Sequence, residues 1–129
     1  MADHQKELLD LTQRLLDSIA AGDWETYASL CDPSLTCFEP ETKGHIVEGM
    51  QFHKFYFENT HGKSLRAETI VDPRVLLLGD DGAVVCYVRL VQRKDSDGRD
   101  VTHRFQETRV WKRAGGEWKH VHFHRSTED

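Results

Sequence analysis

The sequence predicts an α+β fold in which a curved antiparallel sheet packs around a long N-terminal helix. Apolar residues recur at helical spacing near the N-terminus, strand-like alternation dominates the second half, and turns rich in Gly and Asp separate the alternating segments. Helices that precede a run of antiparallel strands are typical of the α+β class. Because 129 residues suffice for one hydrophobic core, we expect a single domain over residues 1–129.

The N-terminal segment predicts two helices that form a hairpin. Leucines and one isoleucine recur every three or four residues from about 5 to 20, and Gly22 ends this first helix. A second helix spans 24–31, with Asp23 as its N-cap, and Pro33 prevents its continuation.

The middle of the chain predicts a short strand and a third helix. The strand covers 35–40, LTCFEP, and stops at its proline. The helix covers 49–59 and is rich in aromatic residues, and we expect Phe52, Phe55 and Tyr56 to face the core.

The second half predicts an antiparallel meander whose turns read GDDG, DSDG and AGGE. Its strands span residues 64–79, 83–93, 101–112 and 118–125. Pro73 cannot donate a ladder hydrogen bond, so the first of these strands must lie at an edge or contain a bulge.

The composition is that of an ordinary soluble protein. Lys and Arg total 17 against 22 Asp and Glu, which gives a net charge of -5. This balance argues against a nucleic-acid partner, which requires a basic patch, and the chain has neither a signal core nor a run long enough to span a membrane. The three cysteines lie outside any CxxC spacing, so we expect no disulfide framework and a reducing, cytoplasmic location.

Three arginines share strand faces with apolar residues. Alternation places Arg89, Arg109 and Arg125 on one concave face, with Glu107 beside them. Buried guanidinium groups need carboxylate partners. One carboxylate cannot neutralise three arginines, so the remaining positive charge predicts a pocket for a small anion. Alternatively, the arginines reach water near strand ends while carboxylates from the helices neutralise them.

The last strand, HVHFHRST, contains three histidines at alternate positions. Alternation predicts that His120, His122 and His124 share the face opposite to Arg125. An HxH pair on one strand face is a possible metal site, with His103 as a further ligand. No other metal motif supports it, so we expect neither a metal nor a cofactor.

Catalysis is the alternative to binding. His53 on the aromatic helix is either a packed histidine or a catalytic base. An isomerase or cyclase on a cone-shaped fold would need a carboxylate with a raised pKa, whereas the surrounding arginines would keep Glu107 ionised. The pocket is therefore better suited to binding anions than to abstracting protons.

Two long stretches closely resemble the association, or hub, domain of calcium/calmodulin-dependent protein kinase type II. They cover residues 31–62 and 106–126, and their motifs include CDP, FEPE, VEGM, FHKFYFEN, ETRVW and VHFHRS. The resemblance implies a cone-shaped fold like nuclear transport factor 2 and the SnoaL-like proteins. It also implies a domain that is not itself an enzyme, because in that family the kinase is a separate domain.

The resemblance further implies self-assembly. Hub domains pair into dimers, and these close into a ring of about 12 to 14 or more subunits that displays kinase subunits, as closed head-to-tail contacts allow. The family's cavity binds small organic acids through arginines that correspond to Arg89, Arg109 and Arg125, with His53 nearby. By this resemblance Arg125 faces inward, and the histidines lie on the other side of the sheet.

Two features depart from the family pattern. After FYFEN the kinase hubs usually continue with a loop that carries a tryptophan, whereas this chain continues THGKSLRAE, with His61. The chain also begins MADHQKELLDL, with no kinase or calmodulin-binding segment before the hub. We expect it to be either a part of a longer kinase or a freestanding hub-like protein.

Overall fold

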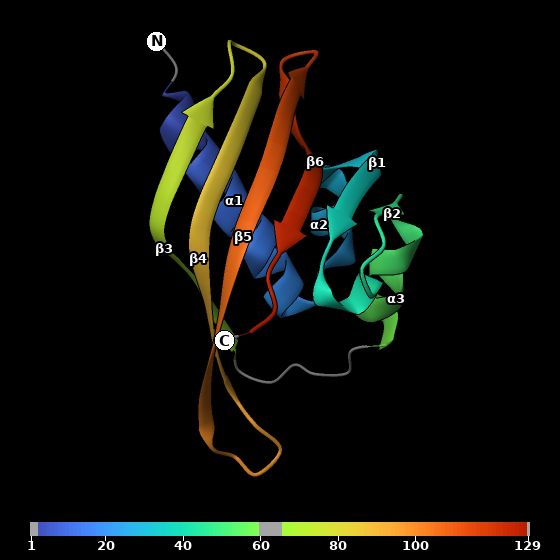
Figure 1. Ribbon diagram of the computed structural model, residues 1–129, viewed down its shortest axis with the longest axis vertical. Coiled ribbons are helices and arrows are strands. Elements are labelled where there is room, and N and C mark those ends of the chain that lie inside the picture. Colours follow the sequence, from blue (N-terminus) through green and yellow to red (C-terminus); the bar gives the residue numbers. More distant parts are fainter. Residues whose placement is uncertain (1–2, 60–65, 129) are drawn as a thin grey trace.

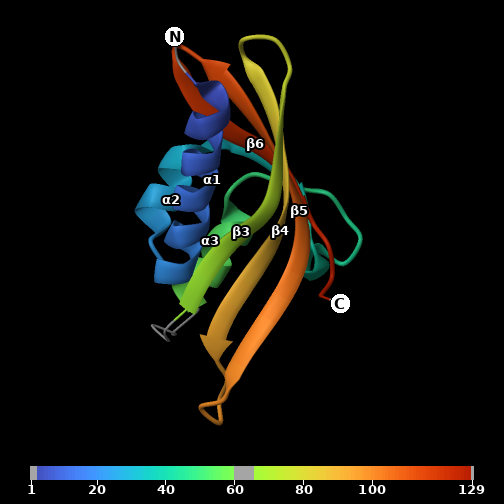
Figure 2. The same ribbon diagram turned by 90° about the vertical axis from the view of Figure 1, so that its left-hand side faces the viewer.

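The molecule consists of a curved sheet whose one face is covered by the helices α1 and α2 (Figures 1 and 2). The computed structural model describes residues 3–59 and 66–128. The elements follow in the order α1 (His4–Ala21), α2 (Trp24–Leu30), β1 (Cys31–Phe38), the 3-10 helix η1 (Pro40–Thr42), β2 (Val47–Glu48), α3 (Gln51–Asn59), β3 (Arg66–Leu77), β4 (Gly82–Lys94), β5 (Asp100–Ala114) and β6 (Glu117–Arg125). This order confirms the predicted α+β class.

The two N-terminal helices begin and end as predicted. The Asp3 side chain caps α1, and Gly22 ends this helix in the left-handed region with φ 68°. Asp23 then caps α2 by accepting a hydrogen bond from the Thr26 backbone N–H.

Strand β1 begins four residues earlier than the sequence predicts and includes Pro33. It runs parallel to β6, and its register shifts between Cys31 and Thr36. Pro33 lies in that irregular stretch, where a missing N–H costs no regular ladder bond. The pairing also makes the sheet mixed, because the order is β2-β1-β6-β5-β4-β3 and the prediction was antiparallel throughout.

Helix α3 presents a different face to the core from the predicted one. His53 is buried and Phe57 packs against the core, whereas Phe55 and Tyr56 are 59% and 39% exposed. His53 and Phe57 are four residues apart and both contact the ring of Tyr27 on α2. The predicted inward position of Phe55 and Tyr56 is therefore wrong, because the packing partner α2 determines which face turns inward.

Strands β3 to β6 form the predicted meander. Strand β3 is the outer strand, and its register shifts between Val71 and Arg74, around Pro73. Pro73 therefore lies both at an edge and at a bulge, as predicted. On β4, every second residue from Ala83 to Val91 is buried beneath the helices.

A bulge in β6 changes the predicted positions of the histidines. Val110 pairs with His122, but Trp111 pairs with His120, so Val121 is an extra residue. His120 consequently turns into the core and is fully buried, whereas His124 is exposed on the outer face. The prediction that the three histidines share the outer face is wrong for His120.

None of the helices in the described ranges is long and apolar enough to cross a lipid bilayer. The hydrophobic core forms between α1 and the sheet. Leu8, Leu15 and Leu16 are fully buried and belong to the same apolar cluster as Val85 and Trp111. This packing fixes α1 across the concave face and leaves room beside it for a cavity.

Candidate functional site

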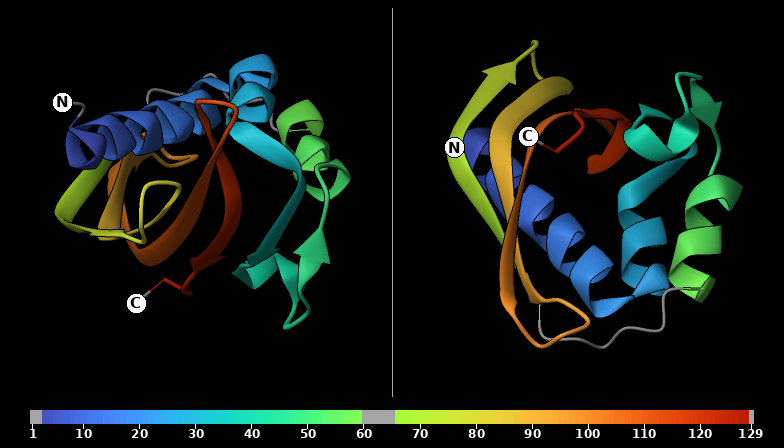
Figure 3. Two further views of the ribbon diagram at one scale, coloured as in Figure 1. Left: turned by 90° about the horizontal axis from the view of Figure 1, so that it is seen from above. Right: turned by 60° about the horizontal axis from the view of Figure 1, so that its bottom comes forward.

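A cavity of about 690 Å³ lies over the concave face of the sheet. Figure 3 shows the sheet curling toward α2 and α3. Residues of both the strands and the helices line the cavity. The predicted residues Arg89, Arg109, Arg125 and His53 all line it. The sequence-based prediction therefore identified four residues that share one cavity, although they lie on four different elements.

Glu107 lies beneath these arginines and not on the cavity wall. It is 2% exposed and stands in cross-strand register with Tyr87 on β4 and Arg125 on β6. Arg89 donates to its carboxylate at 2.9 Å, Arg109 at 3.1 Å, and the Tyr87 hydroxyl at 2.5 Å. Glu107 is thus the shared partner of the deep guanidinium groups, and it holds them together.

Arg89 has a second carboxylate partner that the sequence did not reveal. Its Nε donates to Glu68 at 2.9 Å, and Glu68 also accepts from Arg66 at 3.2 Å. Glu68 lies on β3 two positions before Ile70, the residue paired with Arg89. Alternation places Glu68 on the same inward face as Ile70, next to Arg89 on the neighbouring strand. The sequence therefore contained a signal for this pair.

Arg125 is less deeply buried than the other two arginines. Its guanidinium stacks 4.8 Å from the ring of Phe105 and donates to Glu39 at 3.1 Å and to Glu41 at 2.5 Å. Both glutamates come from the FEPE segment, far away in the sequence. The expectation that Arg125 faces inward is consistent with this position.

The predicted surplus of positive charge is wrong. In the described part of the chain, the three guanidinium groups contact four carboxylates, namely Glu39, Glu41, Glu68 and Glu107. The alternative prediction, that carboxylates from distant segments neutralise the arginines, agrees better with these contacts. Its other part is wrong for Arg109, which is only 1% exposed and does not reach water. Strand alternation defines a face but not which distant segments pack over it.

Electrostatics keep the deep cluster ionised. Burial acts to raise the pKa of Glu107, but the charges of Arg109 and Arg89 outweigh it and bring the pKa to about 2. At neutral pH this carboxylate holds no proton and accepts several hydrogen bonds. It is therefore unsuited to act as a general base, as the sequence predicted.

Two buried histidines stay neutral beside this cluster. Burial and the charge of Arg109 lower the pKa of His53 to about 4, and they hold the pKa of His120 well below its ordinary value. His120 lies 3.3 Å from an Arg109 Nη atom and 3.5 Å from the Cys31 sulfur. The bulge in β6 placed it here, and no sequence signal indicated that bulge.

The predicted histidine set for a metal is divided between the two faces of the sheet. His122 bonds the Thr36 hydroxyl at 2.7 Å, whereas His120 is enclosed in the core. His103 contacts Arg93 and Glu128 instead of the other histidines. His61, in the segment that departs from the family pattern, lies outside the described residues.

A sequence model of one family matches almost the whole chain. This family is the calcium/calmodulin dependent protein kinase II association domain, and the match covers residues 4–129. The calcium/calmodulin-dependent protein kinase type II alpha chain of Drosophila melanogaster is 48% identical over 124 residues, which are 95% of this chain and 23% of that protein. The chain thus spans about a quarter of the length of the curated relatives it matches.

Solved structures agree in sequence and in fold. The Chlamydomonas reinhardtii CaMKII hub homology domain is 48% identical with a TM-score of 0.91, over 96% of this chain and 98% of that one. The Caenorhabditis elegans CaMKII association domain is 45% identical with a TM-score of 0.91, over 96% and 95%. An NTF2-like protein from Cytophaga hutchinsonii, 22% identical with a TM-score of 0.79 over 98% and 99%, shares the fold.

Replacement of Glu107 by Gln should destabilise the protein strongly. The substitution leaves two buried guanidinium groups without their shared charge, a change that typically costs about 3–5 kcal/mol. Urea denaturation at one protein concentration measures the effect. The control is Asp72→Asn, which removes the exposed pair with Arg74 and should cost about 0–1 kcal/mol. Equal effects of the two substitutions would contradict the central role of Glu107.

Acid should destabilise the protein partly through His53. The unfolded chain takes up a proton near pH 6.5, whereas the folded state resists it until about pH 4, because the pKa of His53 is lowered to about 4. Stability conferred by this group is therefore present above pH 6.5 and lost as the pH falls toward 4. His53→Gln should flatten the decline measured by denaturation in a chelating buffer. The exposed His124→Gln should leave the decline unchanged, and an identical decline in all three proteins would contradict the assignment.

Proposed function

The chain belongs to the family of calcium/calmodulin-dependent protein kinase II association domains, and from this membership we propose that residues 1–129 act as one self-assembly module. The module holds copies of itself together and organises any kinase subunits attached to them or recruited by them. The association domain is not the catalytic part of the kinase, so we assign no catalytic residue. Three free cysteines suit a reducing compartment, which we propose is the cytoplasm.

Two separate apolar patches support assembly. The β3 patch consists of Leu76 and Leu78, which are two positions apart and 57% and 61% exposed. The α3 patch consists of Ile46 and Phe55, which are 57% and 59% exposed. Strand β3 and helix α3 lie on opposite sides of the molecule (Figure 1). Exposed apolar side chains can mark contact surfaces, and two separate patches permit two different contacts.

Two different contacts are what a ring of dimers requires. One contact pairs subunits about a two-fold axis, and the other joins neighbouring dimers until the rotation closes. Strand β3 is an edge strand, so its free backbone groups add to what its apolar side chains offer a partner. We propose a closed ring of about 12 to 14 or more subunits built from these contacts.

Charge on either patch should reduce the size of the assembly. Native mass spectrometry of the unmodified chain should show a ring, and Leu76→Lys or Phe55→Lys should each give smaller oligomers because a buried lysine weakens one contact. The double variant should be monomeric. Gln92→Lys, at an exposed polar position of β4, is the matched control and should assemble like the unmodified chain. An unmodified chain that stays monomeric at micromolar concentration would exclude the proposal.

We also propose that the cavity receives small organic acids. Arg125 is the most exposed of the three guanidinium groups, and the ring of Phe105 beside it provides an apolar wall. Glu39 and Glu41 both accept hydrogen bonds from one Nη atom of Arg125, so an incoming carboxylate competes with them for this guanidinium. The receptor therefore works by exchanging one carboxylate for another and not by filling a site with free positive charge.

Glu39 is the carboxylate best suited to leave. Burial and the neighbouring charge of Glu41 raise the pKa of Glu39 above its ordinary value. A protonated Glu39 would release Arg125 to the ligand and would keep no buried charge unpaired. Arg89 and Arg109, by contrast, stay paired with Glu107 and shape the cavity floor.

Short organic acids should raise the thermal unfolding temperature. At a hundredfold excess over its dissociation constant, a specific acid adds about 2.7 kcal/mol of stability. The shift should disappear in Arg125→Gln and persist in Arg104→Gln, which removes an exposed arginine of β5. Uncharged amides of the same acids should have no effect. An equal shift in both variants, or no shift with any acid, would contradict the receptor proposal.

A further inference from the structure

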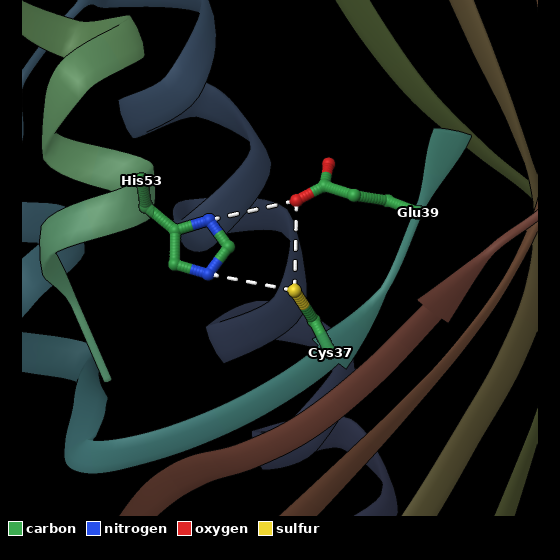
Figure 4. A group of neighbouring side chains, drawn as sticks. All are labelled: Cys37, Glu39 and His53. Carbon is green, nitrogen blue, oxygen red and sulfur yellow. Dashed lines mark hydrogen bonds and ion pairs between the residues drawn. The ribbon is translucent and has the colours of Figure 1, made fainter. Parts of the chain in front are cut away.

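Three side chains with metal-binding atoms meet at the cavity wall (Figure 4). Cys37 lies at the end of β1, Glu39 follows it, and His53 points toward both from α3. The Cys37 sulfur lies 3.6 Å from His53 Nε2 and 3.6 Å from Glu39 Oε2, and the same Oε2 lies 3.6 Å from His53 Nδ1. One possible ligand atom from each of the three residues lies within 4.8 Å of those of the other two.

The local structure holds these side chains in place. Cys37 and Glu39 are two residues apart in extended chain, so their side chains point to the same side. Phe123 and Tyr27 contact the ring of His53 at centroid distances of 5.6 Å and 6.2 Å. Arg125 holds Oε1 of Glu39, which leaves Oε2 directed at the sulfur.

The spacing around the Cys37 sulfur matches the ligand shell of a small tetrahedral ion. Bonds of about 2.3 Å to sulfur and about 2.0–2.2 Å to nitrogen or oxygen place neighbouring ligand atoms about 3.3–3.6 Å apart in a tetrahedron. The two distances from the Cys37 sulfur agree with that value. His53 contacts Glu39 through Nδ1, so the Glu39 carboxylate must turn toward Nε2 for one ion to bind all three ligands. One thiolate, one imidazole and one carboxylate form a borderline-soft donor set, which suits Zn²⁺ better than Mg²⁺ or Ca²⁺.

The charges of the surroundings are compatible with a divalent cation. Glu39 and a Cys37 thiolate together carry two negative charges, and His53 contributes a neutral nitrogen. Arg109 and Arg125 are the cations that face this group, so an ion enters only if the thiol loses its proton to solvent. Arg125 retains Glu41 as its partner when Glu39 turns to the ion.

We propose that Cys37, Glu39 and His53 form a zinc site on the cavity wall. Three protein ligands leave the fourth position of the ion open. Because Glu39 and His53 line the cavity, that position faces the cavity and accepts water or the carboxylate of a ligand. This site is distinct from the assembly surfaces and does not depend on the assembly function.

The same three residues resemble a Cys-His-Glu nucleophile, but their environment favours the metal. A reactive thiolate needs a protonated histidine beside it, and burial together with the charge of Arg109 disfavours that form of His53. Burial also raises the pKa of the Cys37 thiol to about 12, so without an ion the thiol keeps its proton. A bound cation supplies the charge that stabilises the thiolate.

Cobalt(II) is the probe for this site, since thiolate ligation of Co²⁺ gives a charge-transfer absorption. Titration of the metal-free chain should reach one equivalent with that absorption, and Zn²⁺ should abolish it by displacement. Cys37→Ser should lose the absorption, and His53→Gln and Glu39→Gln should weaken binding at least tenfold. Cys86→Ser and Cys31→Ser, which remove the two cysteines outside the cluster, should behave like the unmodified chain.

Alkylation supplies an independent measurement. Iodoacetamide should modify Cys37 slowly in the metal-free chain and more slowly still with Zn²⁺ bound. Circular dichroism of each metal-free variant shows whether it folds, and if Cys37→Ser does not fold, Glu39→Gln alone decides. Cobalt bound without the thiolate absorption, an absorption lost in Cys31→Ser instead, or rapid alkylation that Zn²⁺ does not slow would overturn the proposal.

Discussion

The pairing of Glu107 with two deep arginines is the constraint on which the concave face depends. A buried guanidinium is tolerated only when carboxylates surround it, and Glu107 serves both Arg89 and Arg109. Its neighbours in the register, Tyr87 and Arg125, also contact it. A slip of one residue between β4 and β5 would turn Tyr87 and Arg89 to the face opposite to Glu107 and break their contacts with it. The charged cluster therefore specifies strand register as well as chemistry.

The same cluster explains why the fold contains a cavity. Apolar residues of α1 fill one end of the concave face, where Leu15 and Trp111 are fully buried. At the other end, guanidinium groups project from the sheet and cannot pack against leucine without losing their polar partners. The FEPE segment and α3 cover this end with Glu39, Glu41 and His53, and a space remains between them. Charge, more than apolar packing, keeps that space open.

Strand alternation predicted the part of the site that lies on regular strands. Arg89 and Arg109 occupy inward positions on uninterrupted stretches of β4 and β5, where every second residue shares a face. His120 escaped prediction because a bulge at Val121 reverses the faces on one part of β6 only. Glu39 escaped because its contact with Arg125 joins segments far apart in sequence. Local periodicity thus predicts faces, whereas tertiary packing and backbone irregularities decide which faces meet.

The molecule separates its inner chemistry from its outer contacts. The cavity is lined by charged and aromatic side chains, whereas the exposed leucines lie at the far end of the edge strand β3. Residues at these outer positions make no ion pair with the Glu107 cluster, so the outer surface can change without breaking it. The three residues of the proposed zinc site, Cys37, Glu39 and His53, lie on β1, directly after it and on α3, close to the α3 patch. An occupant that shifts α3 would alter that patch directly, which gives the cavity a short physical route to the contacts between subunits.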